Sequence, residues 1–299
     1  MSDEPVTGRF APTPSGPLHF GSLVTAVASY CHAKAQHGRW LVRIEDVDTP
    51  RVVNGSIDHI LQVLEAFGFE WDGQIEYQRD HFDRYRQVLQ SLFDQHLCYA
   101  CECSRKTLRD ANAQSGPLGL VYPEFCRLKS LGQKGHSVRI NTEGCGIVHY
   151  IDQVHGKVGF NIEKQLGDFV LRRADGIYAY HLAVVIDDEQ QGVNQIVRGA
   201  DLLEATCLHL FLQKALGYKT PQYLHIPLVR NKKGHKLSKQ TGATAVNLND
   251  KSSLLIEALA ILGQPVDREM EQASAKEILI SAIANWNHHN IAVPSGDIY

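Results

Sequence analysis

The first hundred residues alternate between two spacings of hydrophobic side chains. Residues 38–46 form a short apolar run that ends in charged residues, which predicts a strand leading into a loop. Residues 55–67 and 80–97 carry apolar side chains every three or four positions, which predicts two helices. Another helical pattern starts at Leu23, after a turn that follows the end of a short strand near Phe10. This alternation predicts a parallel sheet of the nucleotide-binding kind.

The pattern changes in the middle of the chain. Residues 99–119 are rich in cysteine, serine and glycine, and residues 136–162 break into short strand-like pieces. We expect this stretch to form an inserted α+β module. The α/β pattern returns near Tyr178, and the apolar run at 182–188 predicts a buried strand.

The remaining pattern completes the expected architecture. It predicts a helix at 202–216, a strand at 223–229, and a mostly helical stretch at 252–290 with a break at 263–265. The predicted fold is therefore α/β. Its expected parts are the first half of the sheet domain (1–97), the inserted module (98–177), the second half of the sheet domain (178–245) and a short helical C-terminal region (246–299).

Composition restricts the class of protein. The chain has 299 residues, 43% hydrophobic and 21% charged, which is typical of a globular protein with a substantial core. No apolar stretch is long enough to cross a bilayer, and no secretory signal begins the chain, so we expect a cytoplasmic protein with no membrane partner. Seven cysteines favour reduced thiols or a metal site over a disulfide framework.

The net charge of −3 argues against broad electrostatic coating by nucleic acid. A local RNA site needs only a basic patch. One such patch is formed by Arg230, Lys232, Lys233, His235, Lys236 and Lys239.

Residues 9–23 carry the clearest chemical signal. A strand end is followed by the turn Pro-Thr-Pro-Ser-Gly and then by His-Phe-Gly-Ser, which opens a helix. The first amides of a helix lack internal partners and bind phosphate well. We expect Gly21 to let a nucleotide approach the backbone, and His19 to donate to a phosphate oxygen, with Ser22 beside them.

A second motif lies more than two hundred residues downstream, in a glycine-containing loop. It reads Lys236-Leu237-Ser238-Lys239-Gln240, which alone is more often a solvated loop than a site. Together, in this order, the two motifs resemble the HIGH and KMSKS signatures of class I aminoacyl-tRNA synthetases. The first has Phe for Ile and Ser for the last His, and the second has Leu for Met and Gln for the last Ser.

This resemblance implies a Rossmann-type catalytic domain that uses ATP with Mg²⁺ as substrate. It implies ATP-binding roles for His19, Gly21, Ser22 and Lys239. It also implies that His19, Lys236 and Lys239 do the catalytic work of neutralising phosphate charge.

Four further residues are polar or charged at strand ends or loop entries, where α/β folds place ligands. They are Arg9, Glu45, Tyr180 and Arg198. Each alone is more often an ordinary ion pair. As a set they resemble the amino-acid pocket of glutamyl-tRNA synthetases, in which Ala11 and Thr13 match further contacts. Two arginines can fork the two carboxylates of L-glutamate, and Glu45 can pair with its ammonium group. Which arginine takes which carboxylate is open.

The cysteine-rich stretch offers a metal site. Cys101 and Cys103 form a C-x-C pair, and Cys126 follows 23 residues later. Structural zinc takes four ligands, so Tyr122 or Cys98 must be considered for the fourth. On spacing alone, a zinc site and ordinary structural cysteines are about equally well supported. The resemblance to glutamyl-type enzymes, whose insert often holds zinc, favours one structural zinc bound by Cys101, Cys103, Tyr122 and Cys126.

The chain has 59 residues after Gln240, and full glutamyl-tRNA synthetases continue from that loop into a helical anticodon-binding region. We expect no such region here. The chain therefore resembles most closely the truncated paralogues, the glutamyl-queuosine tRNA(Asp) synthetases. That resemblance implies activation of glutamate without tRNA, and transfer to queuosine at the first anticodon position of tRNA(Asp), by a monomer. The alternatives are a minimal glutamyl-tRNA synthetase that charges a tRNA 3′ end, and a catalytically idle RNA-binding paralogue.

Overall fold

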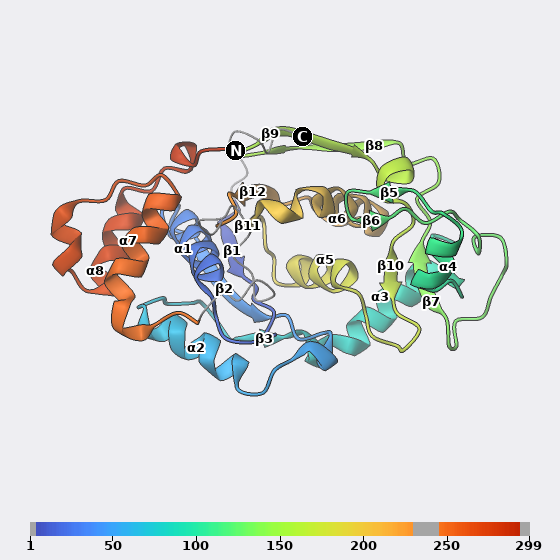
Figure 1. The fold of residues 1–299 in the computed structure, drawn as a ribbon, viewed down its shortest axis with the longest axis horizontal. Helices are drawn as coiled ribbons and strands as arrows, with labels where there is room; N and C mark the ends of the chain where they lie inside the picture. The colour runs from blue at the N-terminus through green and yellow to red at the C-terminus, as the bar shows by residue number, and fades with distance from the viewer. Residues whose placement is uncertain (1–3, 230–244, 294–299) are drawn as a thin grey trace.

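The computed structural model describes residues 4–229 and 245–293. The molecule is elongated, with α7 and α8 at one end and α4 and β7 at the other (Figure 1). The helices are α1 (Phe20–Lys34), α2 (Ser56–Ala66), α3 (Phe82–Asp94), α4 (Arg105–Asp110), α5 (Tyr180–Gln190), α6 (Leu203–Leu216), α7 (Lys251–Ile261) and α8 (Ala275–Ala284). Among the described residues, no helix combines the length and the apolar character needed to span a bilayer.

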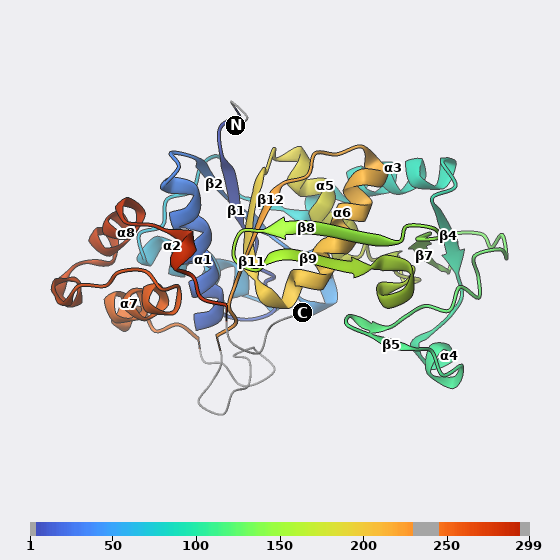
Figure 2. The same cartoon turned by 90° about the horizontal axis from the view of Figure 1, so that it is seen from above.

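Parallel strands form the centre of the fold, as the sequence predicts. The strands of this region are β1 (Thr7–Phe10), β2 (Arg39–Ile44), β3 (Glu76–Tyr77), β11 (Gln195–Gly199) and β12 (Gln222–Ile226). Strands β1, β2 and β3 pair in parallel, and so do β11 and β12. Strands β1 and β11 lie side by side (Figures 1 and 2), and the Asn194 amide donates to the Thr7 carbonyl at 3.1 Å where they begin.

The middle of the chain contributes strands of a different kind. These are β4 (Cys98–Cys101), β5 (Ser115–Gly116), β6 (Gly119–Leu120), β7 (Ser137–Ile140), β8 (Ile147–Asp152), β9 (Gly156–Asn161) and β10 (Val170–Arg172). Strands β10, β7 and β4 form an antiparallel sheet that lies at the end of the molecule with α4 (Figure 2), which confirms an α+β module. The β8–β9 hairpin instead pairs with β12, at Asp152 and Tyr223. The domain boundaries at 97, 177 and 245 stay a prediction.

The predicted strand at 182–188 is wrong, because these residues lie in helix α5. Every residue from Leu182 to Asp188 is buried, since α5 packs between the sheet and the inserted module. A helix that is buried on all sides has no polar face, so its sequence reads as a continuous apolar run. The other predicted helices and strands occur at or near their expected positions.

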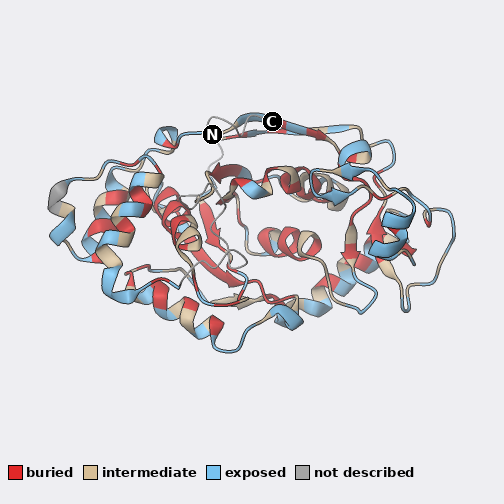
Figure 3. Ribbon diagram, in the orientation of Figure 1, coloured by how far each residue is buried: buried red, intermediate tan, exposed pale blue. Residues whose placement is uncertain are grey.

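Two large hydrophobic clusters hold the fold together. One surrounds α1 and fills the space between the parallel strands and α7 and α8. The other surrounds α5 and α6 and reaches into the inserted module. Figure 3 shows both as buried ribbon flanked by exposed outer turns. Trp40 on β2 is fully buried, and its indole nitrogen donates to Ser29 Oγ at 3.0 Å. The sheet that carries the site residues therefore sits between two packed layers.

Candidate active site

An open cleft of about 1830 Å³ runs from the ends of β1 and β11 to the inserted module. All the described residues that the sequence singles out for glutamate and ATP line this cleft. They are Arg9, Ala11, Thr13, His19, Gly21, Ser22, Glu45, Tyr180 and Arg198. Lys236 and Lys239 lie outside the described residues. The cleft thus brings together residues from five separate segments of the chain.

The turn after β1 and the start of α1 form one wall of the cleft. His19 is the N-cap of α1, and its Nδ1 accepts a hydrogen bond from the Ser22 amide at 3.2 Å. The same ring also contacts Ser22 Oγ through Nε2, at 3.2 Å. The amide of Glu45 donates to the Pro12 carbonyl at 3.0 Å, which fixes the end of β2 against this turn. His19 therefore organises the helix terminus at which the sequence predicts a phosphate site.

A buried four-membered charge network lies behind Arg9. Arg9 Nε is 3.1 Å from Asp188 Oδ1, and Arg43 Nη2 is 2.9 Å from the same oxygen. Arg43 Nη2 also lies 3.3 Å from Glu45 Oε1. Burial raises the pKa of Glu45, against the lowering effect of Arg43 and Arg9. With two positive and two negative members, the network is balanced, and Arg9 and Glu45 are its members that line the cleft.

Arg198 differs from Arg9 in its partners. It is 4% exposed, and it donates from Nε to His225 Nε2 at 3.1 Å and from Nη2 to Thr206 Oγ1 at 2.7 Å. Nη1 donates to the Tyr180 hydroxyl at 3.3 Å, and both terminal nitrogens lie 3.2 Å from His209 Nδ1. Within residues 4–229 and 245–293, no carboxylate forms an ion pair with it. Arg198 therefore adds one uncompensated positive charge to the cleft.

The three predicted cysteine ligands converge in the inserted module. The Sγ atoms of Cys101, Cys103 and Cys126 lie within 4.8 Å of one another, and those of Cys103 and Cys126 are 3.6 Å apart. Sulfur ligands about 2.3 Å from a tetrahedral zinc would be about 3.8 Å apart, so the spacing fits this metal. The Tyr122 hydroxyl is 3.3 Å from Cys101 Sγ and 3.6 Å from Cys103 Sγ.

The other candidate for the fourth ligand lies elsewhere. Cys98 packs in the large core around α5 and α6, whereas Cys101, Cys126 and Tyr122 share a small cluster of their own. The geometry therefore favours Tyr122 over Cys98.

Several residues of the site are not among those predicted from the sequence. Asp188 and Arg43 complete the charge network, and His209, His225 and Thr206 surround Arg198. The acidic pair that ends the apolar run at 182–188 is a signal for Asp188, because a buried carboxylate needs a partner. No local sequence pattern indicates the other four residues. The tertiary fold brings them to the charge network and to Arg198.

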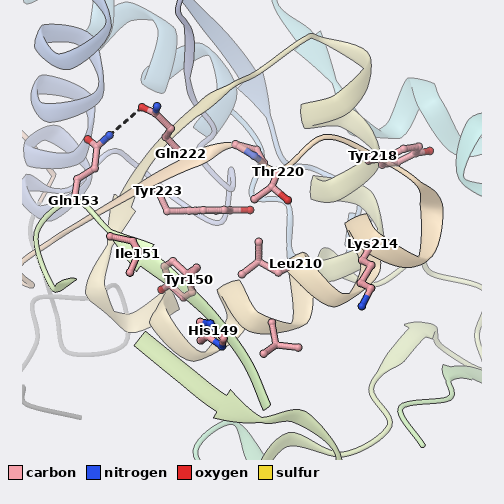
Figure 4. A pocket seen from close by; sticks show the side chains of 12 residues that line it. His149, Tyr150, Ile151, Gln153, Leu210, Lys214, Tyr218, Thr220, Gln222 and Tyr223 are labelled. Atoms are coloured by element: carbon pink, nitrogen blue, oxygen red, sulfur yellow. Dashed lines mark hydrogen bonds between the residues drawn. The ribbon is translucent and has the colours of Figure 1, made fainter. Parts of the chain in front are cut away.

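A second pocket of about 720 Å³ opens between β8, the end of α6 and the start of β12 (Figure 4). Tyr150, Leu210 and Tyr223 line it, and a hydrogen bond of 3.0 Å from Gln153 to Gln222 crosses its edge. None of the predicted site residues lines this pocket. Tyr223 connects it to the cleft, because its ring lies 5.3 Å from the guanidinium carbon of Arg198.

Comparison with solved structures identifies the fold. A glutamate tRNA ligase from Elizabethkingia meningosepticum, in complex with its amino acid, superposes with a TM-score of 0.80 at 24% identity, over 97% of this chain and 66% of the other. Glutamate-tRNA synthetase from Elizabethkingia anophelis superposes with a TM-score of 0.79 at 24% identity, over 97% and 67%. The chain thus spans about two thirds of the length of these structures.

Sequence comparison identifies the family. The family described as tRNA synthetases class I (E and Q), catalytic domain, matches residues 5–294. The glutamyl-Q tRNA(Asp) synthetase of Pseudomonas putida strain W619 is 45% identical over all of both chains. That of Dechloromonas aromatica strain RCB is 46% identical over 95% of each chain. The chain therefore belongs to the class I tRNA synthetases of the E and Q type, as a ligase of the glutamyl-Q tRNA(Asp) synthetase group.

Proposed function

We propose that this chain activates L-glutamate with ATP, without needing tRNA, and transfers the glutamate to queuosine in the anticodon of tRNA(Asp). The names of relatives that match the whole chain at about 45% identity support this reaction. The observation that carries the proposal is the charge balance at the end of the cleft that Arg9, Glu45 and Arg198 line. The network of Arg9, Arg43, Asp188 and Glu45 is neutral, so Arg198 leaves one positive charge for a ligand with a net charge of −1.

Free glutamate has this charge, with two carboxylates and one ammonium group. Arg9 and Arg198 each take one carboxylate, and Glu45 pairs with the ammonium. Ala11 and Thr13 contact the substrate from the turn after β1, and Tyr180 does so from the start of α5. All six line the cleft, which supports a shared ligand.

ATP occupies the part of the cleft at the start of α1. His19, Gly21 and Ser22 bind its phosphates there, and Mg²⁺ accompanies ATP as part of the substrate. A glutamate carboxylate oxygen attacks the α-phosphorus, the bond to the β-phosphate breaks, and pyrophosphate leaves. The protein supplies no nucleophile, so its work is positioning and charge neutralisation by His19, Lys236 and Lys239.

The inserted module holds one structural zinc through Cys101, Cys103, Cys126 and Tyr122. When bound, zinc cross-links β4 to the loop that carries Tyr122 and Cys126. The sulfur spacing supports this ligand set, and so does the Cys126 amide, which donates to the Tyr122 hydroxyl at 2.9 Å. Arg139 also contacts the site, with Nε 3.4 Å from Cys101 Sγ.

The acceptor is a hydroxyl of the queuosine cyclopentenediol. This hydroxyl attacks the carbonyl of glutamyl-adenylate, forming an ester, and AMP leaves. The cleft extends to the exposed face of α4, where Arg105 and Arg109 line it one helical turn apart. Neither forms an ion pair with a described carboxylate, so both are available for RNA phosphates. A cytoplasmic monomer is sufficient for this reaction.

Pyrophosphate exchange tests the activation step. The purified chain, given glutamate, ATP, Mg²⁺ and labelled pyrophosphate but no RNA, should form labelled ATP. A typical glutamyl-tRNA synthetase would need tRNA for this exchange, and an idle RNA-binding paralogue would show none with or without tRNA. Absence of exchange without tRNA would therefore overturn the proposal.

A further inference from the structure

Arg198 is surrounded by neutral side chains, and its hydrogen bonds determine which atoms of those side chains carry protons. A guanidinium carries N–H donors and no acceptor. Every ring nitrogen or hydroxyl oxygen that it contacts must therefore present a lone pair. Those atoms are His225 Nε2, His209 Nδ1, Thr206 Oγ1 and the Tyr180 hydroxyl oxygen.

This requirement fixes the proton of His225. Because Nε2 accepts from Arg198, a neutral His225 carries its proton on Nδ1, which donates to Asp152 Oδ2 at 2.7 Å. Asp152 is itself held in place, since the amides of Val154 and His155 both donate to Oδ1 at 2.9 Å. Burial and the nearby Arg198 charge lower the pKa of His225 to about 4, so the ring is neutral at physiological pH.

The same logic fixes the proton of His209 on the other side of the guanidinium. Nδ1 accepts from Arg198, so the proton is on Nε2, which donates to His181 Nδ1 at 3.0 Å. His209 is buried, and desolvation and the Arg198 charge keep its pKa well below the usual value. The two histidines therefore carry their protons on opposite ring nitrogens, and each turns a lone pair toward Arg198.

Neither ring lines the cleft, whereas Arg198 and Tyr180 do. His225 therefore acts on a ligand through Arg198, whereas His209 acts through Arg198 and through His181, which lines the cleft. Since His225, His209 and Thr206 hold three sides of the guanidinium, the edge at Nη1 beside Tyr180 is the one directed toward the cleft. Because Nη1 donates to both the Tyr180 hydroxyl and His209 Nδ1, a carboxylate that binds this edge takes the place of the Tyr180 hydroxyl.

We infer that His225 and His209 are positioning residues that present Arg198, which pairs with no carboxylate among the described residues, to a carboxylate of the substrate. Asp152 reinforces the tautomer of His225, and the tautomer of His209 in turn requires Nδ1 of His181 to accept a hydrogen bond. This inference rests on the proposed glutamate activation and adds the residues that set glutamate affinity. An ion pair in their place would neutralise Arg198 and weaken the attraction for the substrate.

Two substitutions of similar size at His225 test whether its hydrogen bond to Arg198, and not only its packing, sets glutamate affinity. Gln reaches the position of Nε2 and offers an oxygen to Arg198, whereas Met has similar length and offers no comparable acceptor. We expect His225→Gln to keep the KM for glutamate near the wild-type value, and His225→Met to raise it about tenfold, with the KM for ATP unchanged in both. Equal glutamate KM values in two variants of equal melting temperature would overturn the inference.

His209 provides an independent pair if His225→Met fails to fold. Asn places an oxygen near the position of Nδ1, and Leu has nearly the same shape without it. His209→Asn should bind glutamate about tenfold more tightly than His209→Leu, as measured by the KM in pyrophosphate exchange. Equal affinities in folded variants would contradict the inference.

The tautomers can also be observed directly in the full chain labelled with ¹⁵N-histidine. At neutral pH the spectrum should show the proton on Nδ1 of one histidine whose signal disappears in His225→Gln, and on Nε2 of one that disappears in His209→Asn. A proton on Nε2 of His225 would overturn the inference even if both apolar variants unfold. A wild-type chain with these tautomers but no glutamate-dependent exchange would instead refute the proposed function.

Discussion

Arg9 Nε lies 3.1 Å from Asp188 Oδ1, and these two residues join the first strand of the sheet to helix α5. The Asp188 carboxylate also holds the fully buried Arg43, so it compensates two guanidinium groups at once. The Arg9 and Arg43 charges lower the pKa of Asp188 against the raising effect of its burial, which is the larger single influence. The carboxylate is therefore ionised, and the position of Arg9 depends on it.

Replacing Asp188 by Asn should leave two buried arginines without their shared counter-charge. We expect Asp188→Asn to reduce the free energy of unfolding by about 3–5 kcal/mol, as measured by urea titration. Glu70→Gln is the control, because Glu70 pairs with Lys276 at the exposed surface, and it should lose far less stability than Asp188→Asn. Similar losses in the two variants would contradict the role of Asp188.

Metal analysis of the purified chain should find about one zinc per chain. Cys101→Ser should lose the metal, and Cys98→Ser should keep it, because Cys98 lies in a different hydrophobic cluster. Tyr122→Phe removes the proposed oxygen ligand and should weaken zinc retention during dialysis against a chelator. Loss of zinc from Cys98→Ser, with retention in Tyr122→Phe, would move the fourth ligand to Cys98.

Charge reversal on α4 should separate RNA binding from glutamate activation. Arg105→Glu with Arg109→Glu should slow transfer to tRNA at least about tenfold and reduce the salt dependence of tRNA binding, because two phosphate contacts are lost. Pyrophosphate exchange without RNA should not change. Lys106→Glu is the control, since Lys106 is exposed on the same helix but does not line the cleft. Equal effects of Lys106→Glu would show that only net charge matters.

Acid should destabilise the fold before ordinary carboxyl groups titrate. Burial lowers the pKa of His32, His181 and His225 to about 4, while an unfolded histidine titrates near about 6.5. Between these values the unfolded chain binds more protons, so stability falls as the pH falls. Each such histidine contributes up to about 1.4 kcal/mol per pH unit.

Urea titrations at pH 7 and at about pH 5.5, above the usual carboxyl range, measure this effect. The free energy of unfolding should be lower at the acidic value. His225→Gln should show a smaller decrease, because one histidine is removed. An unchanged free energy of unfolding in the wild-type chain would contradict neutral buried histidines.

Periodicity predicts helices such as α2 and α3 because each has one buried face and one polar face. The parallel strands are buried on both faces and are predicted instead by short apolar runs. Periodicity fails at α5, whose residues from Leu182 to Asp188 are buried on all sides. The motif at 9–23 predicts the start of α1 and the cleft wall, because turn residues and a helix cap are local signals. The partners of Arg198 are not local, since Thr206, His209 and His225 reach it from α6 and β12. No sequence pattern could bring these together without the fold.

Charging of tRNA(Asp) with and without queuosine tests which group accepts the glutamate. The two tRNAs come from cells that make queuosine and from cells that do not, and labelled glutamate attached to each is counted after acid precipitation. We predict that tRNA(Asp) with queuosine accepts glutamate, whereas unmodified tRNA(Asp) and tRNA(Glu) do not. Equal charging of both forms of tRNA(Asp), or efficient charging of tRNA(Glu), would contradict the account and indicate a minimal glutamyl-tRNA synthetase.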